Sequence, residues 1–158
     1  MNEKIETIRK TRAFLLSLVA ELTIDELNEI PQGFNNNIAW NLAHVVAAQQ
    51  GLCYVRAGLQ PWVNEGFVSA YRPGSKPEKK ITIEELEEIK TLMSTSLDQL
   101  ESDLQKGLWT QYPAWTTRYG NELASIDDAV TFLLFHEGLH VGYVMALKRV
   151  VKTASVAL

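Results

Sequence analysis

The chain has 158 residues, of which 46% are hydrophobic and 22% are charged, and its formal net charge at pH 7 is −4. This length and balance are ordinary for a soluble globular protein, so we expect one domain over residues 1–158 with a single buried core. The acidic balance gives no electrostatic reason to expect a nucleic-acid partner. Because Cys53 is the only cysteine, an intramolecular disulfide framework is excluded.

The sequence also bears on where the protein works. Its first residues, MNEKIETIRKTR, are charged and lack the apolar centre of a secretory signal peptide. No uninterrupted apolar run reaches the ~18 residues that a membrane-spanning helix needs. We therefore expect a cytoplasmic protein with no membrane partner.

Apolar residues recur at helical spacing in the first part of the chain, and capping residues mark where helices begin. Residues 3–22 carry this spacing without proline or glycine, which predicts the first long helix. The letters TIDE at residues 23–26 form a capping box for a short helix that ends before Pro31. The asparagines at residues 35–37 can cap a second long helix, which we expect to reach Ala57.

The second half of the chain follows after a long connection. Residues 59–80 contain three prolines and two glycines, so we interpret them as a loop, although loops of this length are uncommon in compact domains. A second capping box, TIEE at residues 82–85, opens a helix with an apolar stripe that ends at Gly107. An aromatic-rich connection covers residues 108–124, and the last helix is capped at Ser125 and continues to Val151.

Four amphipathic helices of about 20 residues each predict an all-α fold, a four-helix bundle. The long connections between consecutive helices allow a topology other than a simple alternation of direction. Cofactor and metal sites in such bundles are formed by side chains that project inward from facing helices.

The three histidines of the chain all lie on predicted inward faces of these helices. His136 and His140 are four residues apart and therefore project from one face of the last helix. His44, in the second long helix, could complete a three-nitrogen metal site with open positions for water or substrate. The alternative is three core histidines, each hydrogen-bonded to a neighbour. We favour metal binding, because imidazoles without charged partners are costly to bury without a purpose.

The letters HEGLH at residues 136–140 also match the HExxH pattern of zinc peptidases, in which Glu137 would be the general base. Those enzymes need a third ligand downstream, but the 18 residues after His140 include no Asp, Glu, His or Cys. The extended HExxHxxGxxH form is also absent. We therefore disfavour a peptidase. Glu137 is left either to orient a metal ligand or to stand in solvent.

Several side chains could line a pocket around the histidines. Trp40 and Asn41 come shortly before His44, and the Asn41 amide could hydrogen-bond to His44 or to a water on the metal. Tyr143 follows His140 on the same helix face, so its hydroxyl could donate to a bound substrate. Trp115 lies in the aromatic connection. For Trp40 and Trp115 a place in the pocket and a place plugging the bundle end are equal alternatives.

The histidines also stand in a distinctive sequence context. The segment FNNNIAWNLAHVVAAQQ is followed, in the last long helix, by HEGLH. In these segments and in the order of its helices, nearly the whole chain resembles the DinB/YfiT-like superfamily of metal-dependent proteins. The resemblance implies a four-helix bundle with up-down-down-up topology and long crossover loops. It also implies a divalent metal bound by His44, His136 and His140, and frequent homodimers.

The resemblance further implies the chemistry of the ligands. It favours nickel or zinc as the metal, with manganese or iron as further candidates. Characterised relatives include thiol-dependent transferases and isomerases that use bacillithiol, mycothiol or glutathione, so a low-molecular-weight thiol is an expected cofactor. Apolar residues in the first helix and in residues 154–158 could join a partner subunit. Three arginines could meet an anionic thiol, although we expect surface solvation for each: Arg56, Arg72 and Arg118.

Three neutral imidazoles leave the full charge of a divalent metal on its remaining ligands, so a bound water or thiol would lose its proton more easily. A thiolate suits the conjugation of a small thiol with an electrophile, whereas a hydroxide suits hydrolysis. We therefore predict a metal-dependent enzyme, a thiol S-transferase that acts on a small-molecule substrate. A metal-dependent hydrolase, a non-catalytic metal-stabilised bundle in stress response, and an empty site stay open as alternatives.

Overall fold

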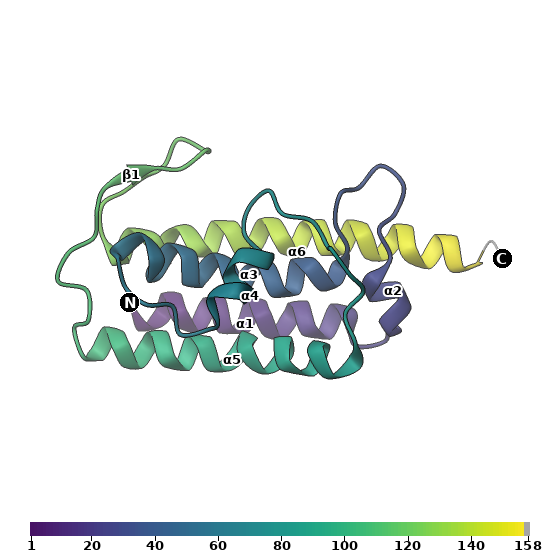
Figure 1. The fold of residues 1–158 in the computed structure, drawn as a ribbon, viewed down its shortest axis with the longest axis horizontal. Coiled ribbons are helices and arrows are strands. Elements are labelled where there is room, and N and C mark those ends of the chain that lie inside the picture. Colours follow the sequence, from purple (N-terminus) through teal and green to yellow (C-terminus); the bar gives the residue numbers. More distant parts are fainter. Residues whose placement is uncertain (157–158) are drawn as a thin grey trace.

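The computed structural model describes the backbone of residues 1–156 and the side chains of residues 1–153. Four long helices lie side by side along its longest axis (Figure 1): α1 (Asn2–Val19), α3 (Ile38–Cys53), α5 (Ile83–Gln105) and α6 (Ile126–Val156). Helix α1 packs against α5 and α6, and α3 packs against the same two helices. The predicted all-α bundle is confirmed by this arrangement.

Contacts between helix ends fix the direction of each helix. Lys4 near the start of α1 binds Asp127 near the start of α6, and Lys148 late in α6 donates to the carbonyl oxygen of Leu18 at 2.7 Å. Helices α1 and α6 therefore run in the same direction. In Figure 1 the colours of α3 and α5 progress the opposite way. The bundle thus pairs two neighbouring helices of one direction with two of the other.

The predicted capping residues begin the helices as expected. Thr23 and Thr82 each form a complete capping box, with Glu26 and Glu85 as the third residues of α2 (Ile24–Asn28) and α5. Of the three asparagines before α3, the one that caps it is Asn37, which accepts a hydrogen bond from the backbone of the third helical residue. These caps satisfy backbone N–H groups that have no partner inside the helix.

The connections differ from the expectation in two places. Residues 59–80, interpreted above as a loop, contain the short helix α4 (Glu65–Ala70), which begins because the side chain of Asn64 accepts from the backbone N–H of Gly66 at 2.7 Å. The second long helix ends at Cys53 and continues only as the 3₁₀ turn η1 (Val55–Ala57). Between α5 and α6 lies a small antiparallel hairpin of β1 (Trp115–Thr116) and β2 (Glu122–Leu123).

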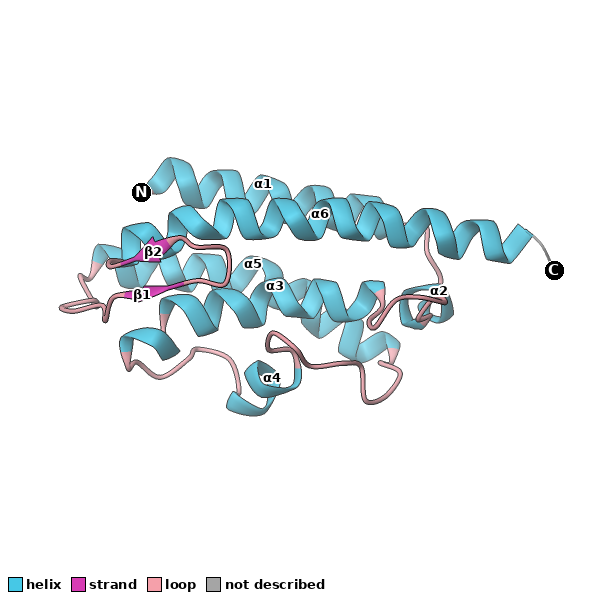
Figure 2. Ribbon diagram, turned by 90° about the horizontal axis from the view of Figure 1, so that it is seen from above, coloured by secondary structure: helices cyan, strands magenta, loops and turns pink. Residues whose placement is uncertain are grey.

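Helix α3 is buried on every side, which explains its even apolarity. All its residues from 38 to 50 are buried, because α5 and α6 cover two faces and the connection that holds α4 covers a third. Figure 2 shows α4 outside the four long helices, beside α3, and the hairpin lies outside them too, where β2 contacts α6. Polar residues on α3 must therefore find partners inside the protein.

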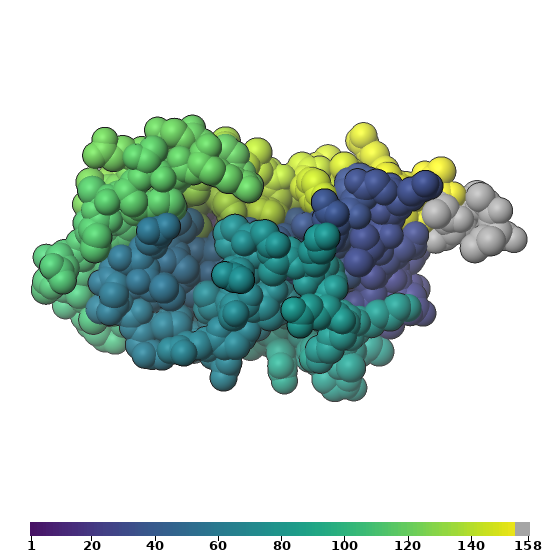
Figure 3. Space-filling model, turned by 45° about the horizontal axis from the view of Figure 1, so that its top comes forward, coloured from purple at the N-terminus to yellow at the C-terminus, as the bar shows by residue number. Residues whose placement is uncertain are grey.

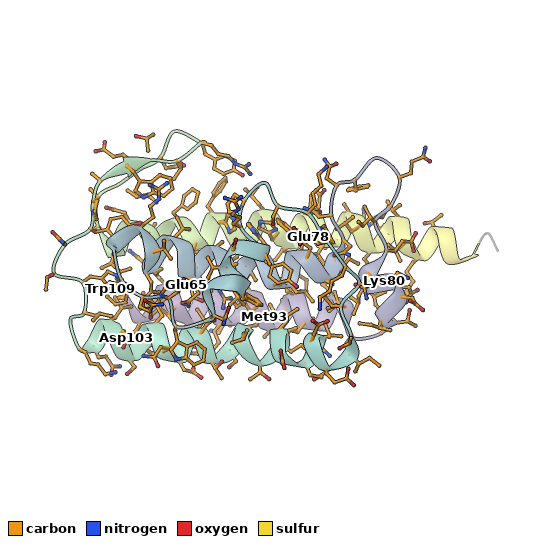
Figure 4. The ribbon with its side chains drawn as sticks, viewed as in Figure 1. Glu65, Glu78, Lys80, Met93, Asp103 and Trp109 are labelled. Atoms are coloured by element: carbon orange, nitrogen blue, oxygen red, sulfur yellow. The ribbon has the colours of Figure 1, made fainter. Side chains whose placement is uncertain are left out.

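Two clusters of buried apolar residues fill the bundle. One cluster, with Leu42 and Leu147, lies toward α2, and the other, with Ile8 and Leu133, lies toward the hairpin. Trp109 belongs to the second cluster and lies near Asp103 at that end of the bundle (Figure 4).

Helix α6 is the longest element, and most of its length is apolar. Its stretch Ile126–Thr153 is long and apolar enough to cross a membrane by length and composition alone, although charged residues interrupt the apolar run. This is weak evidence for a span, since the core helix of a soluble bundle passes the same test. The side chains of residues 154–158, which we expected to join a partner subunit, lie outside the described residues.

Candidate metal centre

Helices α3 and α6 bring the three histidines together. His44 lies on α3, and His136 and His140 lie one turn apart on α6. Three ring nitrogens, one from each histidine, lie within 4.8 Å of one another. The Nε2 atoms of His44 and His136 are only 3.3 Å apart. Among the described residues, no carboxylate or cysteine joins this group.

Two of the histidines are held by oxygen acceptors, which determines their tautomers. The backbone carbonyl oxygen of Tyr71 lies 2.6 Å from Nδ1 of His44, and Oδ1 of Asn41 lies 2.8 Å from Nδ1 of His140. The Asn41 amide is oriented because its Nδ2 donates to the carbonyl oxygen of Asn37 at 2.7 Å. Each Nδ1 therefore carries the proton, and each Nε2 presents a lone pair.

The third histidine lacks such a partner. Nδ1 of His136 is buried and accepts or donates no hydrogen bond to any described atom. Its Nε2 faces the lone pair of His44 at 3.3 Å. Two imidazole lone pairs at this distance repel each other unless a proton or a cation lies between them. The arrangement of the residues therefore fits a divalent cation that prefers imidazole ligands.

The electrostatics of the site favour neutral imidazoles. The pKa of His136 is lowered to about 3 and that of His140 to about 2, mainly by burial and in smaller part by the neighbouring histidines and Arg118. Burial also lowers the pKa of His44, and the hydrogen bond to Tyr71 opposes that shift. At neutral pH all three rings are therefore uncharged, which is the state that a metal ion requires.

Trp40 contacts the site directly. Its ring stacks on the His44 ring with centroids 4.5 Å apart and an angle of 11° between the planes. The indole Nε1 donates to Oγ of Ser75 at 3.1 Å, so the connection that carries α4 holds the tryptophan in place. Of the two alternatives for Trp40, the structure places it against the histidines.

The sequence interpretation missed the supporting role of the connection around α4. Tyr71, directly after α4, contributes a backbone carbonyl, and Ser75 contributes a hydroxyl to Trp40. A backbone acceptor leaves no side-chain signal in the sequence. The length of the segment at residues 59–80 was the available indication, because long connections tend to be functional.

Trp115 and Tyr143 occupy different surroundings. The Arg56 guanidinium lies 3.9 Å from the centre of the Trp115 ring, and Nε1 of Trp115 donates to the hydroxyl of Tyr112 at 3.3 Å. These contacts place Trp115 at the base of the hairpin. Tyr143 is half-buried with its ring edge against Phe34, at a centroid distance of 5.7 Å. Neither ring has a described contact with the three histidines.

Glu137 takes neither of the two roles considered for it above. Its side chain is completely buried and paired with Arg12, whose guanidinium donates to the carboxylate at 2.7 and 2.9 Å. It therefore does not stand in solvent, and it has no described hydrogen bond to a histidine. The reason is geometric, because consecutive helical residues point about 100° apart, so the neighbour of His136 faces the centre of the bundle.

The two described hollows do not contain the histidines. One of about 310 Å³ is bordered by Trp40, Tyr71 and Lys76 among others. A wider one of about 830 Å³ lies beside α2, where Glu78 and Lys80 border it (Figure 4). Neither hollow has a histidine in its lining, so neither is the metal centre.

Comparison with known proteins agrees with the sequence context of the histidines. The family model described as the DinB superfamily matches residues 7–144, a range that includes all three histidines. No curated protein matches the chain. Because the matched range covers most of the sequence, the chain belongs to the DinB superfamily.

Proposed function

We propose that this protein is a metal-dependent enzyme that joins a low-molecular-weight thiol to an electrophilic small molecule. One observation carries the proposal: three uncharged imidazoles present ring nitrogens to a common point, and no fourth protein ligand accompanies them among the described residues. Three protein ligands leave coordination positions for a substrate, whereas structural sites are usually closed by four. Nickel and zinc are the metals that we propose first.

The thiol must come from outside the protein. Cys53 is completely buried in the apolar cluster near the hairpin, together with Leu100 and Leu133. Burial also raises its pKa to about 12, so the cysteine remains a neutral thiol. A residue with these properties is a packing residue rather than a nucleophile or a ligand.

A bound divalent ion would supply positive charge that lowers the pKa of a thiol beside it. The protein's own residues prepare the site for this. Tyr71 and Asn41 hold the Nδ1–H groups of His44 and His140, so that each Nε2 points its lone pair away from the acceptor. Trp40 fixes the plane of the His44 ring by stacking. A rigid set of ligands keeps the geometry constant while substrates exchange.

Hydrolysis is the second candidate for the same site. It is less well supported, because metal-dependent hydrolases of the HExxH type use a glutamate as general base. Here that glutamate, Glu137, is bound to Arg12 inside the bundle. No step of a peptidase mechanism can use a carboxylate held in this way.

The proposal includes a cytoplasmic protein that works as a homodimer. The apolar stretch of α6 is compatible with a soluble bundle, since His136 and Glu137 on this helix are buried among the other long helices. Exposed apolar residues on α6 are available for a subunit contact: Phe135, Leu139, Met145 and Val150.

The first test is elemental analysis of the purified protein beside a His136→Ala/His140→Ala variant. We expect near-stoichiometric metal in the wild type and none in the variant, with circular dichroism to verify that both are helical. The cobalt-loaded wild type should then develop a thiolate-to-cobalt absorption band when 2-mercaptoethanol is added.

Two outcomes would overturn parts of the proposal. If neither protein holds metal after incubation with nickel, zinc and manganese, the enzyme is not metal-dependent. If metal binds but no thiol does, the thiol chemistry is wrong, and a metal-stabilised bundle without catalysis becomes the better description.

A further inference from the structure

The hairpin between α5 and α6 has a fixed tip. The backbone N–H of Thr117 donates to the carbonyl oxygen of Asn121 at 2.8 Å, which closes the turn. Oγ1 of Thr117 accepts from the N–H groups of Tyr119 and Asn121 at 3.3 and 3.2 Å. Gly120 has a φ of 84°, a left-handed conformation that other residues adopt with strain. The residues at this tip are therefore held in one position.

The tip is packed against α6 beside the metal centre. The Tyr119 ring contacts Phe132 and Phe135, at centroid distances of 6.1 and 5.3 Å. The Phe132 ring in turn lies 6.2 Å from the His136 ring. Figure 3 shows the hairpin, in green, on the same face of the molecule as the connection that holds α4, in teal. Both connections thus approach the histidines from outside the bundle.

Arg118 lies on the outer side of this aromatic layer. Its guanidinium carbon is 4.8 Å from the centre of the Tyr119 ring, and Nη2 donates to the Tyr119 hydroxyl at 2.6 Å. A guanidinium has five N–H donors, so most of them remain available. Arg118 is exposed, and within residues 1–153 no carboxylate forms an ion pair with it.

One layer of aromatic rings connects Arg118 to the metal centre. Arg118 lies over the Tyr119 ring, and Tyr119 contacts Phe132. The layer reaches the site through Phe132, whose ring lies 6.2 Å from that of His136. Among the described residues, no carboxylate joins the three histidines, and the buried cation Arg12 is neutralised by Glu137.

A divalent ion and Arg118 would therefore place positive charges near one another without a compensating carboxylate among the described residues. Like charges that lie close together repel each other and attract anions. The missing negative charge can be supplied by whatever small molecule binds there. A planar guanidinium is suited to this, because its N–H groups bind carboxylate or phosphate oxygens in pairs.

We propose that Arg118 binds an anionic group of the substrate, a carboxylate or a phosphate, while another atom of the same molecule binds the metal held by the three histidines. The proposal rests on the proposed function in one respect, namely that the histidines hold a metal. It adds a substrate class, which is small anions, and a specificity residue, Arg118.

The test compares matched ligands on cobalt-loaded protein. The thiol probes are 2-mercaptoethanol, which is neutral, and 3-mercaptopropionate and 2-mercaptoethylphosphonate, which are anionic. A second pair without thiols is imidazole and imidazole-4-acetate. Dissociation constants are read from the cobalt absorption spectrum in the wild type and in Arg118→Met. Comparing the two proteins with the same ligands cancels the intrinsic difference in basicity between the ligands.

We expect Arg118→Met to weaken binding of the anionic ligands by about tenfold and that of the neutral ones less than about twofold, as for loss of a charge-assisted hydrogen bond. The anionic group that Arg118 prefers, carboxylate or phosphonate, is the one whose affinity falls more in Arg118→Met. Arg118→Lys should retain only part of the preference, because it keeps the charge and loses the planar fork. Arg149→Met is the control, an equal charge change on an exposed α6 residue, nine positions beyond His140.

The outcomes separate the two proposals. If the imidazole pair shows the Arg118-dependent preference but no thiol binds, the thiol chemistry fails and the anion site stands. If neutral thiols bind and Arg118→Met changes no anion affinity, or changes it only as much as Arg149→Met does, the anion site fails and the thiol chemistry stands. If cobalt does not bind at all, both fail.

Discussion

Arg12 of α1 and Glu137 of α6 form a buried ion pair at the centre of the bundle, with Nη2 and Oε1 2.7 Å apart. The same guanidinium donates to Oγ of Ser96 on α5 at 3.0 Å and to Oε1 of Gln49 on α3 at 3.2 Å. One side chain of α1 thus contacts the other three long helices. Because Glu137 directly follows His136, the pair also fixes the rotation of α6 that turns the histidines toward α3.

Removing one partner of this pair should be strongly destabilising. Arg12→Met leaves the Glu137 carboxylate buried without its cation, which typically costs about 3–5 kcal/mol. We expect that loss in the free energy of unfolding, measured by urea denaturation. Replacing both residues, as Arg12→Met/Glu137→Leu, should recover much of it, because no charge then remains buried.

Arg9→Met is the matched control on the same helix. Arg9 pairs with Asp98 near the surface at 2.7 Å, where water screens the charges. The loss in the free energy of unfolding should be much smaller for Arg9→Met than for Arg12→Met. Equal losses for the two arginines would show that the central pair has no special role in stability.

The metal-free protein should lose stability in acid. The pKa of His136 is lowered to about 3 and that of His140 to about 2. Between those values and the ordinary pKa of ~6.5, only the unfolded state binds the protons. The contribution of the two histidines to the free energy of unfolding is therefore complete above about pH 6.5. It falls as the pH decreases, with a limiting slope of about 1.4 kcal/mol per pH unit for each histidine.

This slope can be measured by denaturation between pH 7 and pH 4 in the presence of a chelator. Carboxylates add their own dependence at the acid end, so the informative quantity is a difference. Between pH 6 and pH 5, His140→Asn should reduce by about one the number of protons taken up on unfolding, and the slope should fall accordingly. An unchanged slope would mean that His140 is not buried in its neutral form.

Asn41→Leu should weaken metal binding. The Asn41 amide oxygen holds the Nδ1–H of His140, and loss of such a partner typically costs about 10–100-fold in metal affinity. Asn41→Asp should retain tight binding, because a carboxylate accepts the same hydrogen bond. Competition with a chromophoric chelator measures both affinities.

Asn36→Ala provides the comparison for Asn41. The Asn36 side chain only accepts a longer bond, 3.3 Å, from Asn41 Nδ2, and it does not touch a histidine. Its replacement should change affinity little. If Asn36→Ala weakens binding as much as Asn41→Leu, the effect comes from the N-terminus of α3 rather than from His140.

Metal should stabilise the folded protein by bridging α3 and α6. At a free metal concentration a thousand times Kd, ligation adds about 4 kcal/mol to the free energy of unfolding. A rise in Tm on adding nickel or zinc, absent in His44→Ala, is therefore expected. Should His44→Ala leave both metal content and Tm unchanged, the site would be empty or would not involve α3.

Much of the fold follows from local sequence features. The capping boxes at Thr23 and Thr82 begin helices where the sequence places them, and helical spacing identifies the four long helices. These features act within a few residues, so they can be recognised without the tertiary structure. The placement of His136 and His140 on one face of a helix follows from the same periodicity.

Other features depend on residues that are distant in the sequence. The carbonyl oxygen of Tyr71 reaches His44 across 27 positions, and Arg12 reaches Glu137 across 125. Periodicity indicates that a residue faces inward, but it does not say which partner lies opposite. For this reason the sequence by itself determined the helices and the histidine set. The tautomers of the histidines, the burial of Glu137 and the position of Arg118 were decided only by how the helices and connections pack.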